Sequence, residues 1–411
     1  MISDESDRSI HFPLWQTPTK VVNKLFLFVI KVEIVPLQSR IQSCTMTSDA
    51  PVKKSCCTWP RVVFALVLIA IIGVLMWLFI PFDRAIGSRL PYLGNSTGSR
   101  APAVPTAPPP TPSPTLKPYT FIQCQTVDDC CQGLDGICDL RINEILLAGA
   151  HNSFSSLDNG FFIEPNQDFE TKVSLEAGYR DIAIDMCNCD GVYVLCHGYC
   201  KIAELSPIGL LNDVLAFLVA NPSEIIVINM EINSAAGQEV TLDGIYDVLK
   251  SVSGLTDILY QHNDTNSEWP TLRTLRNGGT RIILFHYGGE DCDTGNCPMG
   301  MNYYFDHSVD TRYSFSDLTE IRNTTYSCPI NRGSDRSSKK FFAVNSFITP
   351  TSRSSAAIIN SENFTKIRID DCSSENEDLT VTTYYVDFGS LGDVPRFAQE
   401  RNAAIAQRRR H

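Results

Sequence analysis

Short apolar runs alternate with amphipathic stretches through the C-terminal part of this chain. The runs are rich in β-branched residues, a pattern that indicates parallel strands buried on both faces. They are Ile145–Ala150, Ile182–Met186, Val192–Cys196, Ile225–Ile232, Arg281–Phe285, Phe341–Phe347 and Thr382–Phe388. Stretches with helical spacing lie between them, at Pro207–Ala220, Leu242–Ser251 and Val394–Ala406. This alternation predicts an α/β fold of the TIM type, a closed (β/α)8 barrel, over residues 119–411.

One segment is apolar on every side. Residues 62–81 contain no charged side chain, and about 20 consecutive apolar residues match the hydrocarbon core of a bilayer. We therefore predict a transmembrane helix. A cleaved signal peptide is the alternative, but its apolar core usually has only ~7–15 residues. This run is longer and ends among Trp77, Phe79 and Phe82, which favours a signal anchor.

The charges beside the apolar segment predict its orientation. Lys53, Lys54 and Arg61 precede it, whereas Asp83 and Arg84 nearly cancel after it. Because the positive side stays cytoplasmic, we expect a type II single-pass protein whose large domain is extracellular or lumenal. All N-glycosylation sequons follow the segment, in agreement with this topology. Their asparagines are Asn95, Asn263, Asn323 and Asn363.

Proline, threonine and serine dominate residues 101–118. Such a segment cannot bury a core and tends to an extended conformation, so it is typical of a stalk. The predicted organisation is a cytoplasmic tail (1–61), a transmembrane anchor (62–81), a stalk (82–118) and the barrel domain (119–411).

Cysteine usage and net charge narrow the function classes. Twelve of the 15 cysteines follow the apolar segment, an even number that is consistent with as many as six disulfides in an oxidising compartment. Their spacing contains no zinc-finger set, so we expect no structural zinc. A net charge of −12 gives no reason to expect a nucleic acid as partner.

Reactive side chains follow the first four predicted strands. His151 and Asn152 come after the first strand, Asp185 and Glu231 lie near the ends of the second and fourth, and His197 comes after the third. Because the carboxyl ends of barrel strands meet at one mouth, we expect these side chains to lie together. Imidazoles titrate near neutral pH and suit proton transfer, while amide and carboxylate oxygens suit Ca²⁺ or Mg²⁺.

The sequence around these positions resembles a known family. CDLRINEILLAGAHNSFSS, EAGYRDIAIDMCNCDGVYVLCHGYC and FLVANPSEIIVINMEIN are similar to three blocks of phosphatidylinositol-specific phospholipase C X-type domains. Later stretches, including WPTLRTLRNGGTRIILF, resemble the PLC-like phosphodiesterases of microbial eukaryotes. The resemblance runs from about Cys138 to Ala406, and it implies the barrel fold and phosphodiester hydrolysis.

The resemblance also implies roles for individual residues. His151 and His197 match the two catalytic histidines, and Asn152, Asp185 and Glu231 match calcium ligands of the eukaryotic enzymes. Ca²⁺ is therefore the expected cofactor, ahead of Mg²⁺. One position departs from this pattern, because those enzymes have an acid where this chain has Ala183. The bacterial calcium-independent enzymes have an arginine at the position of Asp185, so this chain does not follow them either.

The expected function is that of a phosphoric diester hydrolase that acts on phospholipid head groups or lipid anchors at a membrane surface. Ala183 leaves two alternatives open. One is a catalytically inactive barrel that serves as a lipid-binding or adhesion ectodomain, and the other is a glycerophosphodiesterase or sphingomyelinase-D-like enzyme. Three residues remain ambiguous. Arg180 is either a phosphate contact or part of a turn ion pair, His286 lines the mouth or is structural, and Asp387 is expected to be structural.

Overall fold

The computed structural model describes residues 124, 128–233, 237–289, 292, 297–333, 341–377 and 379–409. The predicted tail, transmembrane segment and stalk lie outside these residues, as does Asn95. Among the described residues, no helix combines the length and the apolar character that a membrane span needs.

Eight parallel strands of the described residues form the centre of the domain. Their spatial order is β10, β12, β13, β3, β4, β7, β8 and β9. Their bounds are β3 (Leu147–Ala150), β4 (Asp181–Cys189), β7 (Ile226–Ile232), β8 (Ile282–Tyr287), β9 (Met301–Tyr303), β10 (Ser308–Thr311), β12 (Phe341–Ser346) and β13 (Thr383–Val386). The last long strand, β13, lies beside the first, β3, so the sheet curls around an interior.

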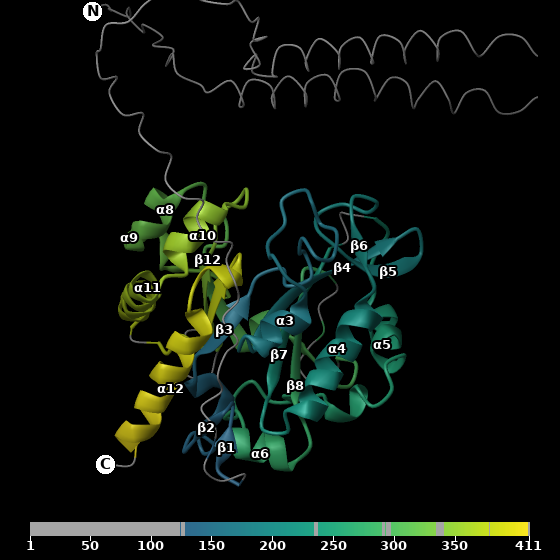
Figure 1. Cartoon of the computed structure of the whole chain (residues 1–411). Helices are drawn as coiled ribbons and strands as arrows, with labels where there is room; N and C mark the ends of the chain where they lie inside the picture. The colour runs from purple at the N-terminus through teal and green to yellow at the C-terminus, as the bar shows by residue number, and fades with distance from the viewer. Residues whose placement is uncertain are drawn as a thin grey trace, which may run out of the picture. The chain divides into compact units, whose positions relative to one another are not determined.

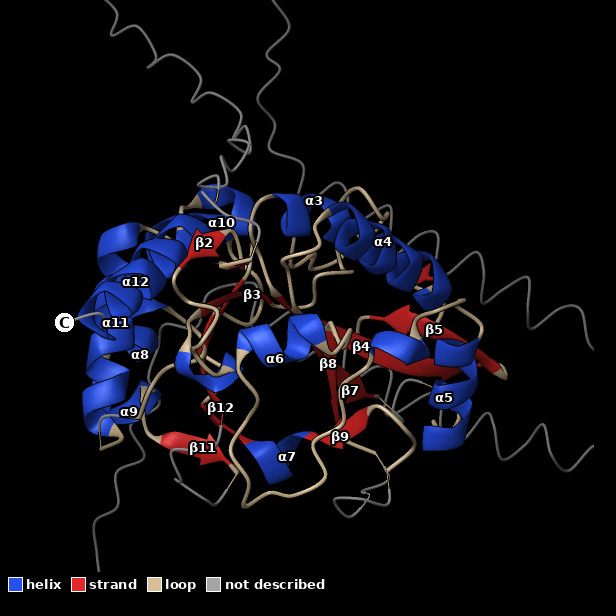
Figure 2. Cartoon of the chain, turned by 90° about the horizontal axis from the view of Figure 1, so that it is seen from below, coloured by secondary structure: helices blue, strands red, loops and turns tan. Residues whose placement is uncertain are grey.

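The predicted closed barrel is wrong in one respect, because the hydrogen-bonded path through the described strands stays open. It ends at β9 on one side and at β11 (Ile330–Arg332), an antiparallel neighbour of β10, on the other. Parallel neighbours need a crossover of about a dozen residues or more, and only α7 (Tyr304–His307) joins β9 to β10. Figure 2 shows α7 between β9 and β11 at this side of the sheet.

Helices cover the outer face of the curled sheet on both sides of β3 (Figures 1 and 2). They are α3 (Thr171–Glu176), α4 (Pro207–Ala220), α5 (Leu242–Lys250), α8 (Leu318–Arg322), α9 (Thr324–Ser327), α10 (Arg353–Ile359), α11 (Glu362–Glu375) and α12 (Val394–Arg409). α6 (Leu272–Asn277) lies instead at one end of the domain (Figure 1), where Leu272 and Leu275 join an inner apolar cluster. The predicted helix over Pro207–Ala220 is confirmed, and Ser206 caps it by accepting a hydrogen bond from the Gly209 amide.

Alternation along each strand divides the core into an outer and an inner layer. Ile182 and Ile184 of β4 face outward and pack with Leu210 of α4 in one apolar cluster. Asp181, Ala183 and Asp185 alternate with them and therefore face the interior. Near the amino ends of the strands the interior is filled by an apolar cluster that includes Leu147, Val227, Phe285, Trp269 and Phe341. Asn229 and Glu231 follow Val227 on the same face of β7, nearer its carboxyl end.

The predicted strand Val192–Cys196 exists as β5, but it is the arm of a hairpin and not a parallel barrel strand. It runs antiparallel to β4 and pairs Val192 with Cys189. Asp190 and Gly191 between them have φ of 55° and 87°, the backbone of the two-residue turn that Asp-Gly favours. β4 therefore continues beyond its parallel partners, and β5 returns toward the mouth beside β6 (Glu204–Leu205).

All twelve cysteines that follow residue 81 form disulfides, as the sequence predicted. The pairs are Cys124–Cys130, Cys131–Cys138, Cys187–Cys196, Cys189–Cys200, Cys292–Cys297 and Cys328–Cys372. Two of these disulfides, Cys187–Cys196 and Cys189–Cys200, cross-link the β4–β5 hairpin. In Figure 1 this hairpin and α10 lie at one end of the domain, and α6 with the short strands β1 (Cys130–Cys131) and β2 (Leu134–Asp135) lies at the other.

Candidate active site

His151 and Asp387 form a hydrogen-bonded pair at the carboxyl ends of two neighbouring strands. Ala150 of β3 pairs with Val386 of β13, so the residue that follows each strand lies beside the other. The Nδ1 of His151 donates to Oδ1 of Asp387 over 2.8 Å. Asn166 Nδ2 donates to the same carboxylate oxygen over 3.0 Å. This assignment places the proton of the neutral imidazole on Nδ1, which leaves Nε2 with a lone pair that can accept a proton.

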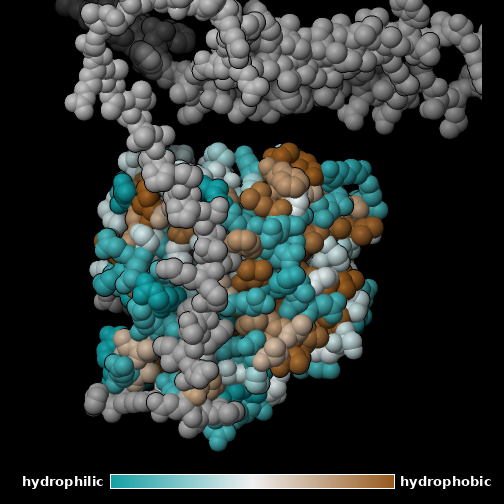
Figure 3. Space-filling view, in the orientation of Figure 1, coloured by the Kyte–Doolittle hydropathy of each residue, from teal (hydrophilic) through white to brown (hydrophobic). Residues whose placement is uncertain are grey.

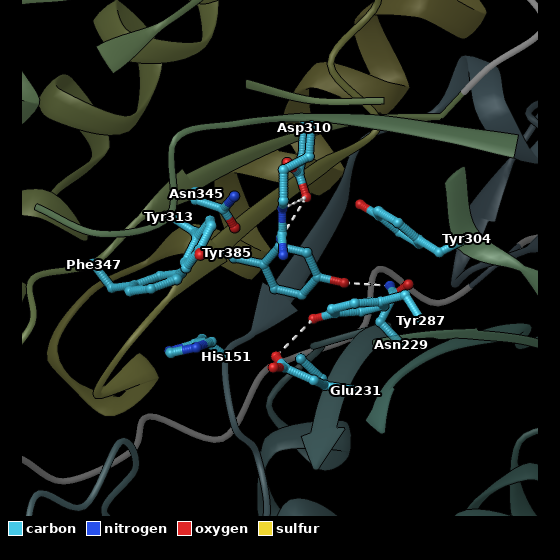
Figure 4. Close-up of a pocket in the computed structure, with 12 residues that line it drawn as sticks. His151, Asn229, Glu231, Tyr287, Tyr304, Asp310, Tyr313, Asn345, Phe347 and Tyr385 are labelled. Carbon is cyan, nitrogen blue, oxygen red and sulfur yellow. Dashed lines mark hydrogen bonds and ion pairs between the residues drawn. The ribbon is translucent and has the colours of Figure 1, made fainter. Parts of the chain in front are cut away.

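Phe347 fixes the plane of the His151 ring. The two rings stack with centroids 3.6 Å apart and planes that differ by 5°, and Figure 4 shows them side by side at the edge of the pocket. Phe347 follows β12, so three strand ends hold one imidazole. The His151 side chain stays 23% exposed, which leaves it accessible to a substrate.

His197 lies at the same mouth, at the end of the disulfide-linked β4–β5 hairpin. It follows Cys196 at the end of β5, and its Nδ1 lies 3.4 Å from Ser155 Oγ in the loop after β3. Burial lowers the pKa of His197, and the nearby charge of His151 lowers it further. Asp387 and Glu164 act in the opposite direction. The two imidazoles therefore influence each other electrostatically, as expected of groups that face one reaction centre.

Asp185 and Glu231 occupy paired positions on β4 and β7. Burial raises the pKa of Asp185 well above its usual range, and the adjacent negative charge of Glu231 raises it further. The hydroxyl of Tyr287, which pairs with Glu231 on β8, donates to Glu231 Oε2 over 3.3 Å. Two carboxylates side by side in a buried site are stable together only with a proton or a cation between them.

Asn152 follows β3, so the three predicted oxygen donors come from adjacent strands. It has a left-handed φ of 41°, which asparagine tolerates better than most residues. The amide of the next residue, Ser153, donates to the Ala183 carbonyl over 2.8 Å and ties this turn to β4. Asn152, Asp185 and Glu231 offer amide and carboxylate oxygens, which are the ligand types that Ca²⁺ takes. Ala183 supplies no side-chain oxygen.

A pocket opens beside His151 and Glu231 (Figure 4). Its lining comes from the eight parallel strands or the residues next to them, and from β11. The lining residues are His151, Ala183, Asn229, Glu231, Tyr287, Tyr304, Asp310, Tyr313, Arg332, Asn345, Phe347 and Tyr385. Gly149 makes room for this lining, because a Cβ there would lie 2.6 Å from the Tyr385 ring.

A hydrogen-bond network supports the inner wall of the pocket. Asp181, one pleat below Ala183, accepts hydrogen bonds from Asn229, Thr383 and the Tyr385 hydroxyl at 2.9, 2.7 and 2.7 Å. Burial raises the pKa of Asp181 to about 6, although these three hydrogen bonds favour the ionised form. The network fixes the Tyr385 ring across the interior, where it packs against Ala183 and Phe347.

Arg332 and Asp310 form an ion pair in the pocket that the sequence did not predict. They are cross-strand partners on β11 and β10, and Nη2 of Arg332 lies 2.6 Å from Asp310 Oδ2. Burial raises the pKa of Asp310 to about 6 even with Arg332 beside it, so the pair is ionised at neutral pH. Arg332 lies in a short polar stretch with no periodic pattern, so the sequence contained no signal for it.

Two of the ambiguous residues are structural. Arg180 precedes β4 and so lies at the amino end of the strand, away from the mouth. Its Nε donates to Glu224 over 2.6 Å and its Nη1 to the Leu175 carbonyl over 2.7 Å, which supports the turn ion pair and not a phosphate contact. His286 pairs with the outward-facing Met230, is fully buried, and lies 3.1 Å from Cys292 Sγ.

The asparagines of the three described sequons lie on the surface. Asn263, Asn323 and Asn363 are all exposed. In one of them the hydroxyl of Thr325 donates to Oδ1 of Asn323 over 2.8 Å, within the sequon itself. The geometry is compatible with glycosylation, which stays a prediction.

Comparison with known protein families identifies the family of this chain. A family model described as PI-PLC X 1 matches residues 137–397, which include both histidines, the three oxygen donors and Asp387. This chain belongs to the PI-PLC X family.

Individual PI-PLC X relatives are distant in sequence. The chain is 28% identical over 188 residues to PI-PLC X domain-containing protein 1 from Arthroderma benhamiae, which covers 44% of this chain and 59% of that protein. The match thus spans 59% of the length of this curated relative.

The similar solved structures are also distant from this chain in sequence. A mutant of the phosphatidylinositol-specific phospholipase C from Staphylococcus aureus is 17% identical, with 64% of this chain and 92% of that chain covered and a TM-score of 0.43. PLC21 from L. pealei is 10% identical, with 62% of this chain and 32% of that chain covered and a TM-score of 0.34.

Proposed function

We propose that this member of the PI-PLC X family is a phosphoric diester hydrolase that cleaves phospholipid head groups or lipid anchors by acid–base catalysis with His151 and His197. The observation that carries the proposal is the 2.8 Å hydrogen bond between His151 and Asp387, at the mouth that His197 also reaches. A buried carboxylate that holds an imidazole in one tautomer prepares its other nitrogen for proton transfer.

In this proposal the two histidines have different roles. Nε2 of His151 takes the proton from the attacking hydroxyl, and Asp387 stabilises the imidazolium that forms. The hydroxyl oxygen bonds to phosphorus while the bond from phosphorus to the leaving oxygen breaks. His197 donates its proton to that leaving oxygen, which departs as an alcohol. When the attacking hydroxyl belongs to the substrate, the product is a cyclic phosphodiester, and water opens it with the roles of the histidines exchanged.

We further propose that Asn152, Asp185 and Glu231 hold a divalent cation, with Ca²⁺ preferred to Mg²⁺. The support is the pairing of Asp185 with Glu231 across β4 and β7, which concentrates negative charge where a cation would relieve it. A bound Ca²⁺ would supply positive charge that stabilises the oxygens of the phosphoryl group. Without a cation, Asp185 takes up a proton more readily, because its pKa is raised.

Exposed apolar side chains at the mouth support action at a membrane surface. Phe162 and Ile163, in the loop after β3, are 78% and 64% exposed, and the Glu164 backbone next to them accepts a hydrogen bond from His197. Tyr199 and Ile202, after β5, are also exposed. Figure 3 shows apolar side chains gathered at this end of the domain, over the side where Figure 1 labels β4, β5 and β6. The proposed location outside the cytoplasm is supported by the six disulfides.

An assay of the full chain on a phosphodiester panel tests the proposal. The chain would be purified into detergent–lipid mixed micelles and tested on inositol, choline, glycerol and sphingomyelin diesters, with Ca²⁺ or with chelator. We expect turnover of at least one phospholipid, and a loss of ~10²–10⁴-fold when either His151 or His197 is replaced by alanine. His286→Gln is the matched histidine control, which should disturb stability more than rate.

Two results would redirect the proposal. Equal turnover by the wild type and both histidine variants would show that the catalytic assignment is wrong. A wild type that is inert on every diester and metal would favour the inactive lipid-binding ectodomain, the alternative that Ala183 supports by removing an oxygen from the pocket wall. Cleavage confined to glycerol diesters or sphingomyelin would favour the related enzyme classes.

A further inference from the structure

A groove on the surface separates α11 from the short helices α8 and α9. Figure 2 shows these helices on the flank of the domain opposite α4 and α5. We call it the α9–α11 groove, and its lining residues are Ile321, Arg322, Thr324, Asn363, Phe364, Ile367, Arg368 and Asp371. None of them lines the pocket beside His151, so the groove is separate from the proposed active site.

The groove presents apolar surface to the solvent. Ile321 and Phe364 belong to one apolar cluster, and Ile367, on the next turn of α11, is 49% exposed. Arg368 is buried, and its Nε donates to Ser346 Oγ over 2.8 Å. A ligand of this groove would therefore gain by covering apolar atoms and not by pairing with Arg368. Isolated exposed apolar side chains are common on protein surfaces, so Ile367 matters here because of what lies next to it.

A predicted glycosylation site opens onto this apolar surface. Asn363, Ile367 and Asp371 are spaced four residues apart on α11, so they lie in a row along one face of the helix. Asn363 is exposed and lines the groove. A sugar attached to its Nδ2 therefore starts one helical turn from Ile367. A second sequon asparagine, Asn323, follows α8 on the opposite wall.

The side chains of the groove suit the first sugar of an N-glycan, which is N-acetylglucosamine. The C–H face of such a ring packs on apolar and aromatic side chains, which Phe364 and Ile367 provide. Its hydroxyl and acetamide groups form hydrogen bonds with polar side chains, and the groove offers those of Arg322, Thr324 and Asp371. Covalent attachment holds the sugar beside the groove, so its binding is intramolecular and needs little affinity of its own.

We propose that the α9–α11 groove binds the first N-acetylglucosamine of a glycan carried by Asn363, and that this sugar covers Ile367. The glycan comes from a lipid-linked oligosaccharide diphosphate. The amide nitrogen of Asn363 bonds to the anomeric carbon of the sugar, the bond from that carbon to the diphosphate breaks, and the nitrogen gives up one proton. The inference depends on the predicted lumenal location of the domain, and it holds whether or not the chain hydrolyses phosphodiesters.

Glycopeptide mass spectrometry tests the modification on the full chain, produced in a eukaryotic secretory host. We expect a glycan on Asn363. A chain in which Asn363 is unmodified would overturn the proposal. If that unmodified chain forms dimers that Ile367→Gln disrupts, the groove belongs to a second copy of the chain instead.

Thermal melting measures whether the first sugar occupies the groove. Asn363→Gln should lower Tm by ~2–4 °C, the scale on which the loss of a small apolar contact shifts a large domain. Trimming the wild-type glycans enzymatically to their first N-acetylglucosamine should leave Tm unchanged, because that sugar stays in place. Asn263→Gln is the matched sequon control, since Asn263 does not line the groove. An equal loss in this control would show that glycans stabilise the chain without any part played by the groove.

A double-mutant cycle identifies the contact. Ile367→Gln should lower Tm of the glycosylated chain but have little effect in the Asn363→Gln background, where no sugar covers the side chain. Ile208→Gln on α4 is the control, because Ile208 is 39% exposed on the opposite flank and should have the same effect in both backgrounds. Equal losses for Ile367→Gln in both backgrounds would show that the glycan does not cover it. If Asn363→Gln is not secreted, complete enzymatic removal of the glycans from the folded chain provides the second background.

Discussion

His151 donates to Asp387 across the seam between the first and the last long strand of the sheet, although the two residues are 236 positions apart in the chain. The contact exists because β13 pairs with β3. Asp387 is 3% exposed, so its charge acts on the imidazole with little screening by water. Asp387 is therefore a positioning residue that acts through His151.

Asp387→Asn tests this relationship. The amide keeps the shape of the carboxylate but cannot stabilise an imidazolium, so kcat should fall by ~10²–10⁴-fold. Because Asp387 acts through His151, adding Asp387→Asn to His151→Ala should cause little further loss. A kinetic double-mutant cycle measures this, with thermal melting as the check on folding. Losses that multiply in the double variant would show that Asp387 acts independently of His151.

On the alkaline side of the pH profile, activity should be lost at a lower pH than an unperturbed histidine would give. His197 must be protonated to act as the acid, and burial and the charge of His151 lower its pKa below the usual 6.5. The value of kcat/KM should therefore fall as the pH rises through a pKa below 6.5. In His151→Gln the nearby positive charge is absent, so an NMR titration of His197 should give a higher pKa than in the wild type. An unchanged or lower pKa would contradict the proposed proximity.

The metal site should respond to changes at Glu231 and Ala183 in opposite directions. Glu231→Gln removes a charged donor, so more Ca²⁺ should be needed for half-maximal activity, and excess Ca²⁺ should restore part of the loss. Ala183→Asp adds a carboxylate one pleat below Asp185 and should increase the affinity for Ca²⁺. Calcium titrations of activity and calorimetry on both variants measure this. Activity that persists in chelator and ignores both changes would exclude a catalytic cation.

The strands with long apolar runs were predicted from the sequence because burial on both faces requires such runs. β9 and β10 were missed because they have three and four residues and include polar Asn302 and Asp310. The role of Asp387 was missed because a polar residue after a strand is common. Its significance comes only from the pairing of the last strand with the first. Arg332 was not identified as a pocket residue, because it lies on an edge strand whose sequence has no periodic pattern.

The β4–β5 hairpin was misread for a different reason. An apolar run has the same appearance in a barrel strand and in a hairpin arm, and only the Asp190–Gly191 turn distinguishes the two. His197 still reaches the mouth, because β4 runs past its parallel partners and β5 returns. Opening this staple in a Cys187→Ser, Cys196→Ser variant should therefore lower kcat/KM by ~10²-fold through misplacement of His197, with less effect on substrate binding. The Cys328→Ser, Cys372→Ser variant, whose disulfide lies between α9 and α11, is the control, and an equal loss there would indicate general destabilisation.

Exposed side chains near His197 should anchor the domain to lipid. Replacing Phe162 and Ile163 with serine removes two apolar groups, each worth ~1.5–3 kcal/mol when fully buried, so binding to phosphatidylinositol vesicles should weaken by ~10-fold or more. Turnover of a short-chain, monomeric substrate should change little, because neither residue lines the pocket. Val219→Ser is the matched control, since Val219 is 76% exposed at the end of α4 that leads toward the amino end of β7. Sedimentation with vesicles measures the binding, and equal losses in the control and the double variant would show that this loop has no special part in membrane contact.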